Sequence, residues 1–326
     1  MKPLRLGILG TGLAARRLYW PELKNLKKSV QLVACANRTR RKAELFAKDC
    51  GIPRVVDDAE RLFSMPQVEA VLISLPIEQQ PRYVLQALKA GKHVLSEKPL
   101  AANLVEGRRL LKAARPYQKK GLLWLVGENF HFMPHVAKAE EWLAQGALGD
   151  VRLAEARQLT FMDEGNPYFH TSWRTKPKFV GGFVADAGVH VADIVRRFLG
   201  MPTEIKSLTA QFNPALPPLD TALAVLRFRS GVVGTWTSCF SAKDSGPMLA
   251  LRGSSADLEI FWDHILLKPH IGPSRAYRAK HGSFYAQFLH FARAVRGLEA
   301  LSFAPEEALA DLAFMQGIVQ GRALKP

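Results

Sequence analysis

The chain has 326 residues, 48% hydrophobic and 23% charged, which is the composition of a soluble globular protein with about two domains. The net charge of +16 would attract anionic ligands, but the Lys and Arg residues are scattered without a DNA-binding motif, so we expect no nucleic-acid partner. No apolar run is long enough to span a bilayer, the first residues lead directly into a strand, and the three cysteines are dispersed, which predicts a cytoplasmic protein with no membrane segment and no zinc site.

Residues 1–127 alternate short apolar runs with helical segments. The expected strands are Leu4–Leu9, Gln31–Ala36, Ala70–Leu75, His93–Ser96 and Leu122–Gly127, and the expected helices are Leu13–Leu26, Arg41–Cys50, Gln80–Ala90 and Asn103–Ala114. Strands that alternate with helices of this length predict βαβ units and a doubly wound parallel sheet, hence an α/β fold.

A glycine-rich loop follows the first strand and opens the first helix. Its residues are Gly10, Thr11, Gly12, Leu13, Ala14 and Ala15, with Ala15 in the third glycine position of the dinucleotide fingerprint. The glycines allow a tight turn and close approach of a pyrophosphate, whose charge the helix N-terminus favours. We therefore expect residues 10–14 to bind a dinucleotide cofactor.

The end of the second strand distinguishes NAD from NADP. An acidic residue there would bind the ribose 2′-hydroxyl of NAD, but the chain has Asn37, Arg38 and Thr39, with Lys42 one helical turn beyond. Arg38 can bind a 2′-phosphate bidentately, while Asn37 and Thr39 offer donors and Lys42 adds charge. The alternative is a solvated basic turn. We predict NADP(H), with NAD possible.

Lys98 lies directly after another short strand, between Glu97 and Pro99. Pro99 disfavours helical backbone at the lysine, and ligands of parallel sheets bind beyond the carboxyl ends of the strands. Lys98 is therefore a candidate for a cation in the cofactor crevice. The alternative is a surface lysine at a strand-to-helix turn.

The second half has strand candidates in near succession. They are Val151–Thr160, Ile205–Phe212, Ala222–Phe228, Val232–Ser238, Met248–Arg252 and Leu258–Trp262, followed by helices at Phe284–Arg296 and Pro305–Gln320. This pattern predicts an α+β domain on a largely antiparallel open sheet. We place the boundary so that residues 1–128 form the first domain and residues 129–326 the second.

Asp186 and His190 lie one turn apart on a helix expected from Asp186 to Leu199. A carboxylate beside an imidazole suits proton transfer near neutral pH, and Gly188 between them would let a ligand approach closely. The alternative is an N-terminal Asp cap with a core histidine, and Asp193 is expected to be structural. With no third ligand in view, no metal is expected.

The order of these motifs resembles the glucose–fructose oxidoreductase / inositol dehydrogenase / MocA (Gfo/Idh/MocA) family over essentially the whole chain. The resemblance rests on Gly10–Ala15, Gly91–Pro99, Asn129–Pro134, Gly146–Gly149, Trp173–Thr175 and Asp186–His190. It implies an N-terminal Rossmann domain and a C-terminal domain whose open sheet packs against a partner's sheet in homodimers or homotetramers.

The resemblance also implies residue roles. Lys98, Asp186 and His190 would be catalytic in hydride transfer between NADP(H) and a sugar, cyclitol or related hydroxy or keto compound. In oxidation His190 would take the hydroxyl proton while Lys98 polarises the oxygen. The further cofactor residues would be Leu75, Pro76, Gln80, Glu97 and Asn129, and the substrate residues His131, Tyr168, Trp173 and Arg174, although Trp173 would equally suit core packing.

Two segments depart from the family pattern. Gln80 stands where the family often has a histidine, and Asn129-Phe130-His131-Phe132 replaces the frequent Asn-x-Arg-Phe. A cofactor-binding sensor without catalysis and an NAD-assisted glycosidase are the alternative functions. The presence of Lys98 and His190 argues against the sensor, and the missing acidic residue at position 37 argues against the glycosidase.

Overall fold

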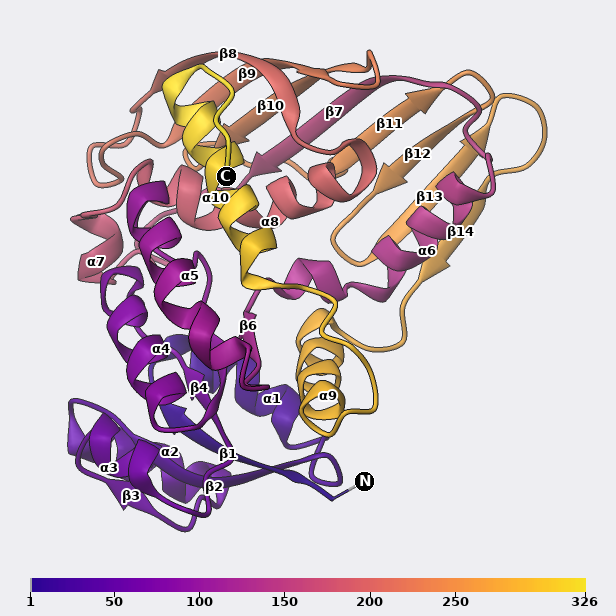
Figure 1. Ribbon diagram of the computed structural model, residues 1–326. Helices are drawn as coiled ribbons and strands as arrows, with labels where there is room; N and C mark the ends of the chain where they lie inside the picture. Colours follow the sequence, from indigo (N-terminus) through magenta and orange to yellow (C-terminus); the bar gives the residue numbers. More distant parts are fainter. Residues whose placement is uncertain (1) are drawn as a thin grey trace. The chain divides into compact units, whose positions relative to one another are not determined.

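The computed structural model describes residues 2–326 and divides into two compact units (Figure 1). Unit 1 takes in the chain up to Gly127 together with Phe284–Leu309, and unit 2 consists of Glu128–Ser283 and Ala310–Pro326. The sequence division at residues 128 and 129 differs from this in two respects, because Glu128 opens unit 2 and Phe284–Leu309 groups with the N-terminal unit. Tyr19 explains the grouping, since its ring meets those of Phe284 and Phe288 edge-on at 5.5 Å.

Unit 1 is built on a six-stranded sheet in the order β3-β2-β1-β4-β5-β6, and every neighbouring pair is parallel. The strands are β1 Leu4–Leu9, β2 Val30–Ala36, β3 Val55–Val56, β4 Ala70–Ile73, β5 His93–Ser96 and β6 Trp124–Val126. The helices are η1 Ala15–Tyr19, α1 Trp20–Leu23, α2 Arg40–Cys50, α3 Ala59–Ser64, η2 Ile77–Gln79, α4 Gln80–Lys89, α5 Leu104–Gln118 and nearly all of α9 Ser283–Val295. The predicted doubly wound parallel sheet is confirmed.

The strands of unit 1 are apolar because helices cover both faces of the sheet. All four residues of β4 are buried, as are five of the six residues of β1. Strand order reverses between β1 and β4, and at such a switch point the crevice beyond the strand ends receives the ligand. The glycine-rich loop leaves β1 at this point.

Unit 2 is built on an eight-stranded sheet in the order β14-β13-β12-β11-β7-β10-β9-β8. Its strands are β7 Val151–Leu159, β8 Pro202–Ala210, β9 Thr221–Phe228, β10 Val233–Cys239, β11 Leu249–Gly253, β12 Ala256–Ile260, β13 His264–Pro269 and β14 Arg275–Arg278. Only the β7–β10 pair is parallel among these strands of residues 151–278, so the expected largely antiparallel sheet is confirmed.

One face of this sheet packs on helices and the other carries apolar side chains at the surface. The helices are η3 Asn129–Phe132, α6 Pro134–Ala144, α7 Ser172–Thr175, α8 Gly182–Leu199 and α10 Pro305–Gln320, and α8 packs on β7, β9, β10 and β11 (Figure 1). Along β9 buried and exposed residues alternate, as a half-covered strand requires. The core of unit 2 lies between α8 and the sheet and includes Trp236, Phe183 and Phe314.

Two helices differ from the sequence expectation, one at its start and the other in its type and its end. Helix α8 starts at Gly182, four residues before Asp186, so Asp186 lies inside the helix and is not its N-cap. Gly181 and Gly182 both have positive φ, and a Cβ on Gly182 would lie 2.5 Å from the carbonyl oxygen of Pro217. The first helix contains a π-helical turn, η1, and then ends at Leu23 instead of Leu26.

Residues 2–326 contain neither a membrane-spanning helix nor a cluster of metal ligands. No helix in that part of the chain has the length and apolar character needed to cross a membrane. No group of three His, Cys, Asp or Glu side chains among the same residues is arranged to hold a metal ion. The three cysteines are unpaired, and burial raises the pKa of the Cys35 thiol to about 11.

Candidate active site

The glycine loop of unit 1 has the geometry of a dinucleotide cradle. Gly10 has a φ of +96°, and a side chain there would overlap the carbonyl oxygen of Ser74 at the end of β4. A Cβ on Gly12, by contrast, would meet no atom within 4 Å, so the backbone is open to close approach at this position. Ala15, in the third glycine position, is fully buried. These residues fit a dinucleotide, which would lie over Gly12.

Two buried polar side chains of unit 1 also point to a ligand. Thr11 is 1% exposed and its hydroxyl has no partner within residues 2–326, and the same holds for both amide atoms of the fully buried Gln80. Unpartnered buried polar groups are costly, so each is expected to gain a hydrogen bond from a bound molecule. Both residues were predicted to bind the cofactor.

The predicted cofactor residues at the end of β2 differ in whether their side chains have hydrogen-bond partners. Asn37 is engaged locally, because its Oδ1 accepts from the Thr11 N–H at 3.3 Å and its Nδ2 donates to the Thr39 carbonyl at 3.1 Å. Arg38 and Lys42 are exposed, and their side chains make no hydrogen bond or ion pair to the described residues. Arg40 is instead paired with Glu44 and Asp57. Arg38 therefore has an exposed guanidinium with no partner among residues 2–326.

Lys98 leaves β5 in a segment fixed by neighbouring strands. The Glu97 N–H donates to the Ile73 carbonyl at 3.0 Å, and the Ser96 carbonyl accepts from Gly127 at 2.7 Å. The Glu97 carboxylate accepts from the Tyr19 hydroxyl and from the Lys98 backbone N–H. Glu97 therefore ties the exit of β5 to the helix behind the glycine loop and positions Lys98, which is half-buried.

In unit 2 the carboxylate hydrogen-bonded to His190 is that of Glu128, which sequence reasoning missed. Nδ1 of His190 contacts Oε1 of Glu128, and Glu128 is only 1% exposed. The imidazole stacks on the ring of Phe130 with centroids 4.3 Å apart and planes 15° apart. In the sequence Glu128 is a single carboxylate shortly after an apolar strand. This pattern is too common to identify Glu128 as the partner of His190.

Asp186 lies one turn from His190 on α8, as predicted, but its carboxylate pairs with an arginine. The distance from Arg174 Nε to Asp186 Oδ2 is 2.8 Å, and the Asp186 side chain is 5% exposed. The guanidinium of Arg174 also lies over the rings of Trp173, at 3.8 Å, and Tyr168, at 4.9 Å. Three of the four predicted substrate residues therefore form one cluster anchored by Asp186.

His131 and Asn129, the remaining predictions in unit 2, have partners inside the unit. His131 Nδ1 lies 3.2 Å from Asp193 Oδ1, and the Asp193 side chain is buried. The Asn129 amide donates to the Ser283 hydroxyl at 2.7 Å. Gly188 does not face a ligand: a Cβ there would lie 2.8 Å from the sulfur of Met315, so its small size admits α10 and the expectation of ligand approach is wrong.

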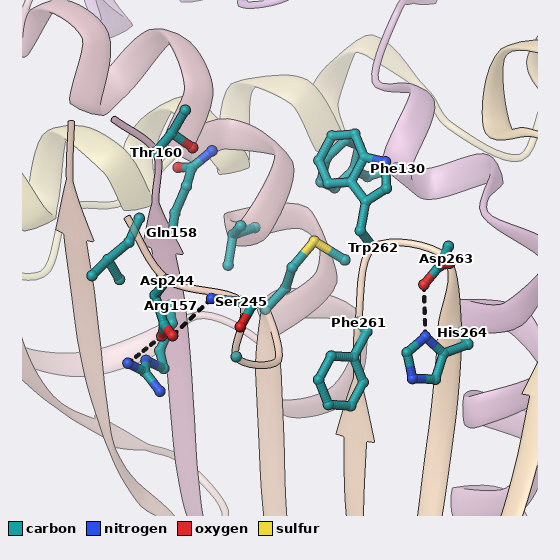
Figure 2. A pocket seen from close by; sticks show the side chains of 14 residues that line it. Phe130, Arg157, Gln158, Thr160, Asp244, Ser245, Phe261, Trp262, Asp263 and His264 are labelled. Atoms are coloured by element: carbon teal, nitrogen blue, oxygen red, sulfur yellow. Dashed lines mark hydrogen bonds and ion pairs between the residues drawn. The ribbon is translucent and has the colours of Figure 1, made fainter. Parts of the chain in front are cut away.

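A pocket of about 360 Å³ opens in unit 2 (Figure 2). Phe130, which stacks on His190, and Trp262 form one wall, with their centroids 4.9 Å apart. Figure 2 shows Gln158 and Thr160 on the opposite side and the paired side chains of Asp244 and Arg157 below them. The buried Oε1 of Gln158 has no partner among residues 2–326. The pocket thus combines aromatic walls with polar groups, as small-molecule sites do.

Models of known protein families match the sequences of both units. The model of an oxidoreductase family with an NAD-binding Rossmann fold matches residues 4–125, and the GFO/IDH/MocA C-terminal domain matches residues 136–259. The chain is 31% identical over 265 residues to the Saccharomyces cerevisiae protein YMR315W, which covers 80% of this chain and 74% of the yeast protein.

Two further relatives have named activities or solved structures. The chain is 31% identical over 243 residues to trans-1,2-dihydrobenzene-1,2-diol dehydrogenase of Bos taurus, covering 74% of this chain and 69% of that enzyme. The crystal structure of an oxidoreductase from Thermotoga maritima is 33% identical with a TM-score of 0.91, covering 98% of this chain and 97% of the other.

The fold and the cofactor cradle define an NAD(P)-dependent dehydrogenase or reductase. Within that class, the chain belongs to the Gfo/Idh/MocA family of oxidoreductases.

Proposed function

We propose that the chain transfers a hydride between NADP(H) and a ring carbon of a sugar, cyclitol or related cyclic diol. The observation that carries this proposal is the imidazole of His190, held by a buried carboxylate in a chain whose other unit has an open glycine cradle. The bovine relative acts on a cyclic vicinal diol, which supports a substrate with neighbouring hydroxyl groups.

NADP is favoured over NAD by the charges at the end of β2. Arg38 is exposed and has no partner among the described residues, and Lys42 adds a second such cation. A guanidinium binds a phosphate through two parallel hydrogen bonds. The carboxylate that would select the ribose of NAD is absent from the 37–39 segment.

Lys98, Asp186 and His190 are assigned the chemistry at the substrate. When bound, NADP supplies the hydride acceptor or donor. In oxidation Nε2 of His190 takes the hydroxyl proton, while the Lys98 ammonium stabilises the developing charge on the oxygen. In reduction His190 returns the proton to the oxygen. Asp186 supports this chemistry through Arg174, which it holds against the aromatic rings of Tyr168 and Trp173.

We also propose that the exposed face of the unit 2 sheet is the contact between copies of the chain in a homodimer or homotetramer. Five apolar side chains on β7, β8, β9 and β10 are exposed on the sheet, namely Leu153, Leu208, Leu223, Val225 and Val233. Such clusters on a soluble protein mark interaction surfaces.

A substrate panel tests the proposed function. Absorbance at 340 nm would be followed with NADP⁺ or NAD⁺ and a set of sugars, inositols and cyclic trans-diols, and with NADPH or NADH and the matching ketones. We expect turnover with at least one ring alcohol and a preference for NADP. Tight NADP binding without turnover of any compound would instead indicate a sensor.

A further inference from the structure

We infer that Glu128 is the positioning residue of His190: its carboxylate fixes which ring nitrogen carries the proton and which faces the substrate. The inference rests on the proposed function for its mechanistic meaning, but its geometry belongs to unit 2 alone. Glu128 precedes η3 and caps it, since its Oε1 accepts the Phe130 N–H at 3.2 Å.

Two contacts from this one turn hold the imidazole. Oε1 of Glu128 contacts Nδ1, and the ring of Phe130 stacks on the imidazole face. The carboxylate fixes one edge of the ring and the phenyl ring fixes its plane. His190 is therefore held in one orientation, with its side chain 14% exposed.

The contact with Glu128 selects a tautomer. An ionised carboxylate only accepts hydrogen bonds, so Nδ1 must carry the hydrogen. The neutral ring then has its lone pair on Nε2, the nitrogen that must accept the substrate proton. With the opposite tautomer, Nε2–H could not act as a base. Glu128 thus holds His190 in the form that oxidation requires.

During oxidation Glu128 holds a hydrogen bond and exchanges no proton. The O–H bond of the substrate breaks and its proton goes to Nε2, while the C–H hydride passes with its electron pair to NADP⁺. The imidazolium that forms keeps its Nδ1–H on the Glu128 carboxylate, which stabilises the new positive charge at close range. Reduction runs the same changes backwards.

Several charged groups lie around Glu128 and His190. Asp193 and Arg196 lie on the same helix as His190, and Asp311 faces Arg196 from α10 at 2.5 Å. His131 from η3 pairs with Asp193. Burial, and then the Asp193 carboxylate, raise the pKa of Asp311 well above its ordinary value, while Arg196 lowers it.

The second oxygen of Glu128 supports a functional role. Oε2 is buried and has no hydrogen-bond partner within residues 2–326. A carboxylate kept only for stability would be expected to use both oxygens, because an unpaired buried oxygen costs free energy. Glu128 therefore keeps a carboxylate beside His190 at a cost in the free energy of unfolding.

The test is ¹⁵N NMR of the apoprotein together with the pH profile of turnover. The imidazole of His190, assigned by its loss in His190→Asn, should show the neutral Nδ1–H tautomer in the wild type. In Glu128→Gln the amide oxygen can still accept from Nδ1–H and from the Phe130 N–H, so the tautomer should be kept while the negative charge is lost. The same variant should lose ~10²–10³-fold in kcat with little change in KM or in NADP affinity.

Two further variants separate positioning from folding. Glu128→Asp keeps the charge and should recover part of kcat and of the wild-type pH profile. Glu141→Gln, which removes an exposed carboxylate paired with Lys138, should match the wild type. The acid limb of the kcat/KM profile should move to lower pH in Glu128→Gln. An Nε2–H tautomer in the wild type, or an unchanged profile and kcat in Glu128→Gln, would overturn the inference.

The two proposals fail in different ways. If the wild type turns over no compound of the panel, the proposed function fails while the wild-type tautomer still decides the role of Glu128. If the Glu128 variants do not fold, as judged by their thermal transitions, the wild-type spectrum alone decides.

Discussion

At the scale of single residues, the distinction between partnered and unpartnered charges determines which side chains remain available to ligands. Arg38 and Arg40 are two residues apart on the same basic turn, yet only Arg40 is tied to carboxylates. The sequence places Glu44 one helical turn after Arg40, but it gives no sign of Asp57, which reaches Arg40 from another segment of the chain. The same holds for His190, whose carboxylate comes from 62 residues away.

The difference between the two arginines predicts a matched pair of binding results. Arg38→Ala should weaken NADP binding ~10–100-fold, corresponding to the loss of a charged hydrogen-bonding pair, and leave NAD binding nearly unchanged. Arg40→Ala should leave both affinities within about twofold, since exposed ion pairs contribute little. Fluorescence titration with both nucleotides measures this. Equal losses for NADP in the two variants would contradict the assignment of Arg38.

At the scale of elements, periodicity and turn residues predicted most of the architecture, and the errors have physical causes. The alternation in β9 and the apolar run of β4 follow from burial on one face or on both. The strands β13 and β14 were missed, and β14 is exposed throughout, so no apolar pattern marks it. The start of α8 was missed because two glycines in left-handed conformation precede its buried face.

Gly188 shows how a helix position can suggest function and yet serve packing. A Cβ in Gly188→Ala would press on the Met315 side chain of α10, and we expect a loss of ~1–3 kcal/mol in the free energy of unfolding from overpacking. Combining Gly188→Ala with Met315→Ala should cost less than the sum of the two single losses, because the truncation removes the clash. Urea denaturation of the single and double variants measures both. A Gly188→Ala variant as stable as the wild type would show that the Met315 side chain can move aside without cost.

A half-buried ion pair links the end of α9 to the sheet of unit 1. Arg296 donates to both oxygens of Glu69, which also accepts from the Arg5 N–H. Burial alone would raise the pKa of Glu69, but the hydrogen bonds from Arg296 and Arg5 outweigh it and lower the pKa to about 2.

Because this folded-state pKa lies below the ordinary value of 4.5, Glu69 stabilises the fold above about pH 4.5 and loses that contribution as pH falls toward 2. Glu69→Gln should cost ~1–2 kcal/mol at pH 7. The cost should shrink steadily below pH 4.5. Denaturation curves at pH 7, 5, 4 and 3 follow it, and a cost independent of pH would refute the ion-pair account.

At the scale of the whole molecule, the family resemblance predicted both folds and the presence of two parts, but not how the chain is shared between them. Residues Phe284–Leu309 return to unit 1 because the rings of α9 pack on Tyr19 and Arg296 pairs with Glu69. Such long-range contacts leave no local signal. The identity of the carboxylate beside His190 was hidden for the same reason.

The apolar sheet face predicts the state of assembly. Leu208→Glu with Val225→Glu places charges on β8 and β9, where the side chains are 80% and 58% exposed, so a folded monomer should survive while self-association is lost. Light scattering coupled to size exclusion would measure the mass of each form. A wild type that is monomeric at all concentrations would contradict the proposed interface.

The central claim is hydride transfer assisted by Lys98 and His190, and Lys98→Ala tests it most directly. The measurement is the single-turnover rate at 340 nm with saturating NADP⁺ and a substrate found in the panel, beside Lys89→Ala, which removes an exposed lysine of α4. We expect the rate to fall by ~10³-fold or more in Lys98→Ala. NADP affinity in that variant and the rate of Lys89→Ala should stay near those of the wild type. A rate in Lys98→Ala within tenfold of the wild type would contradict the account.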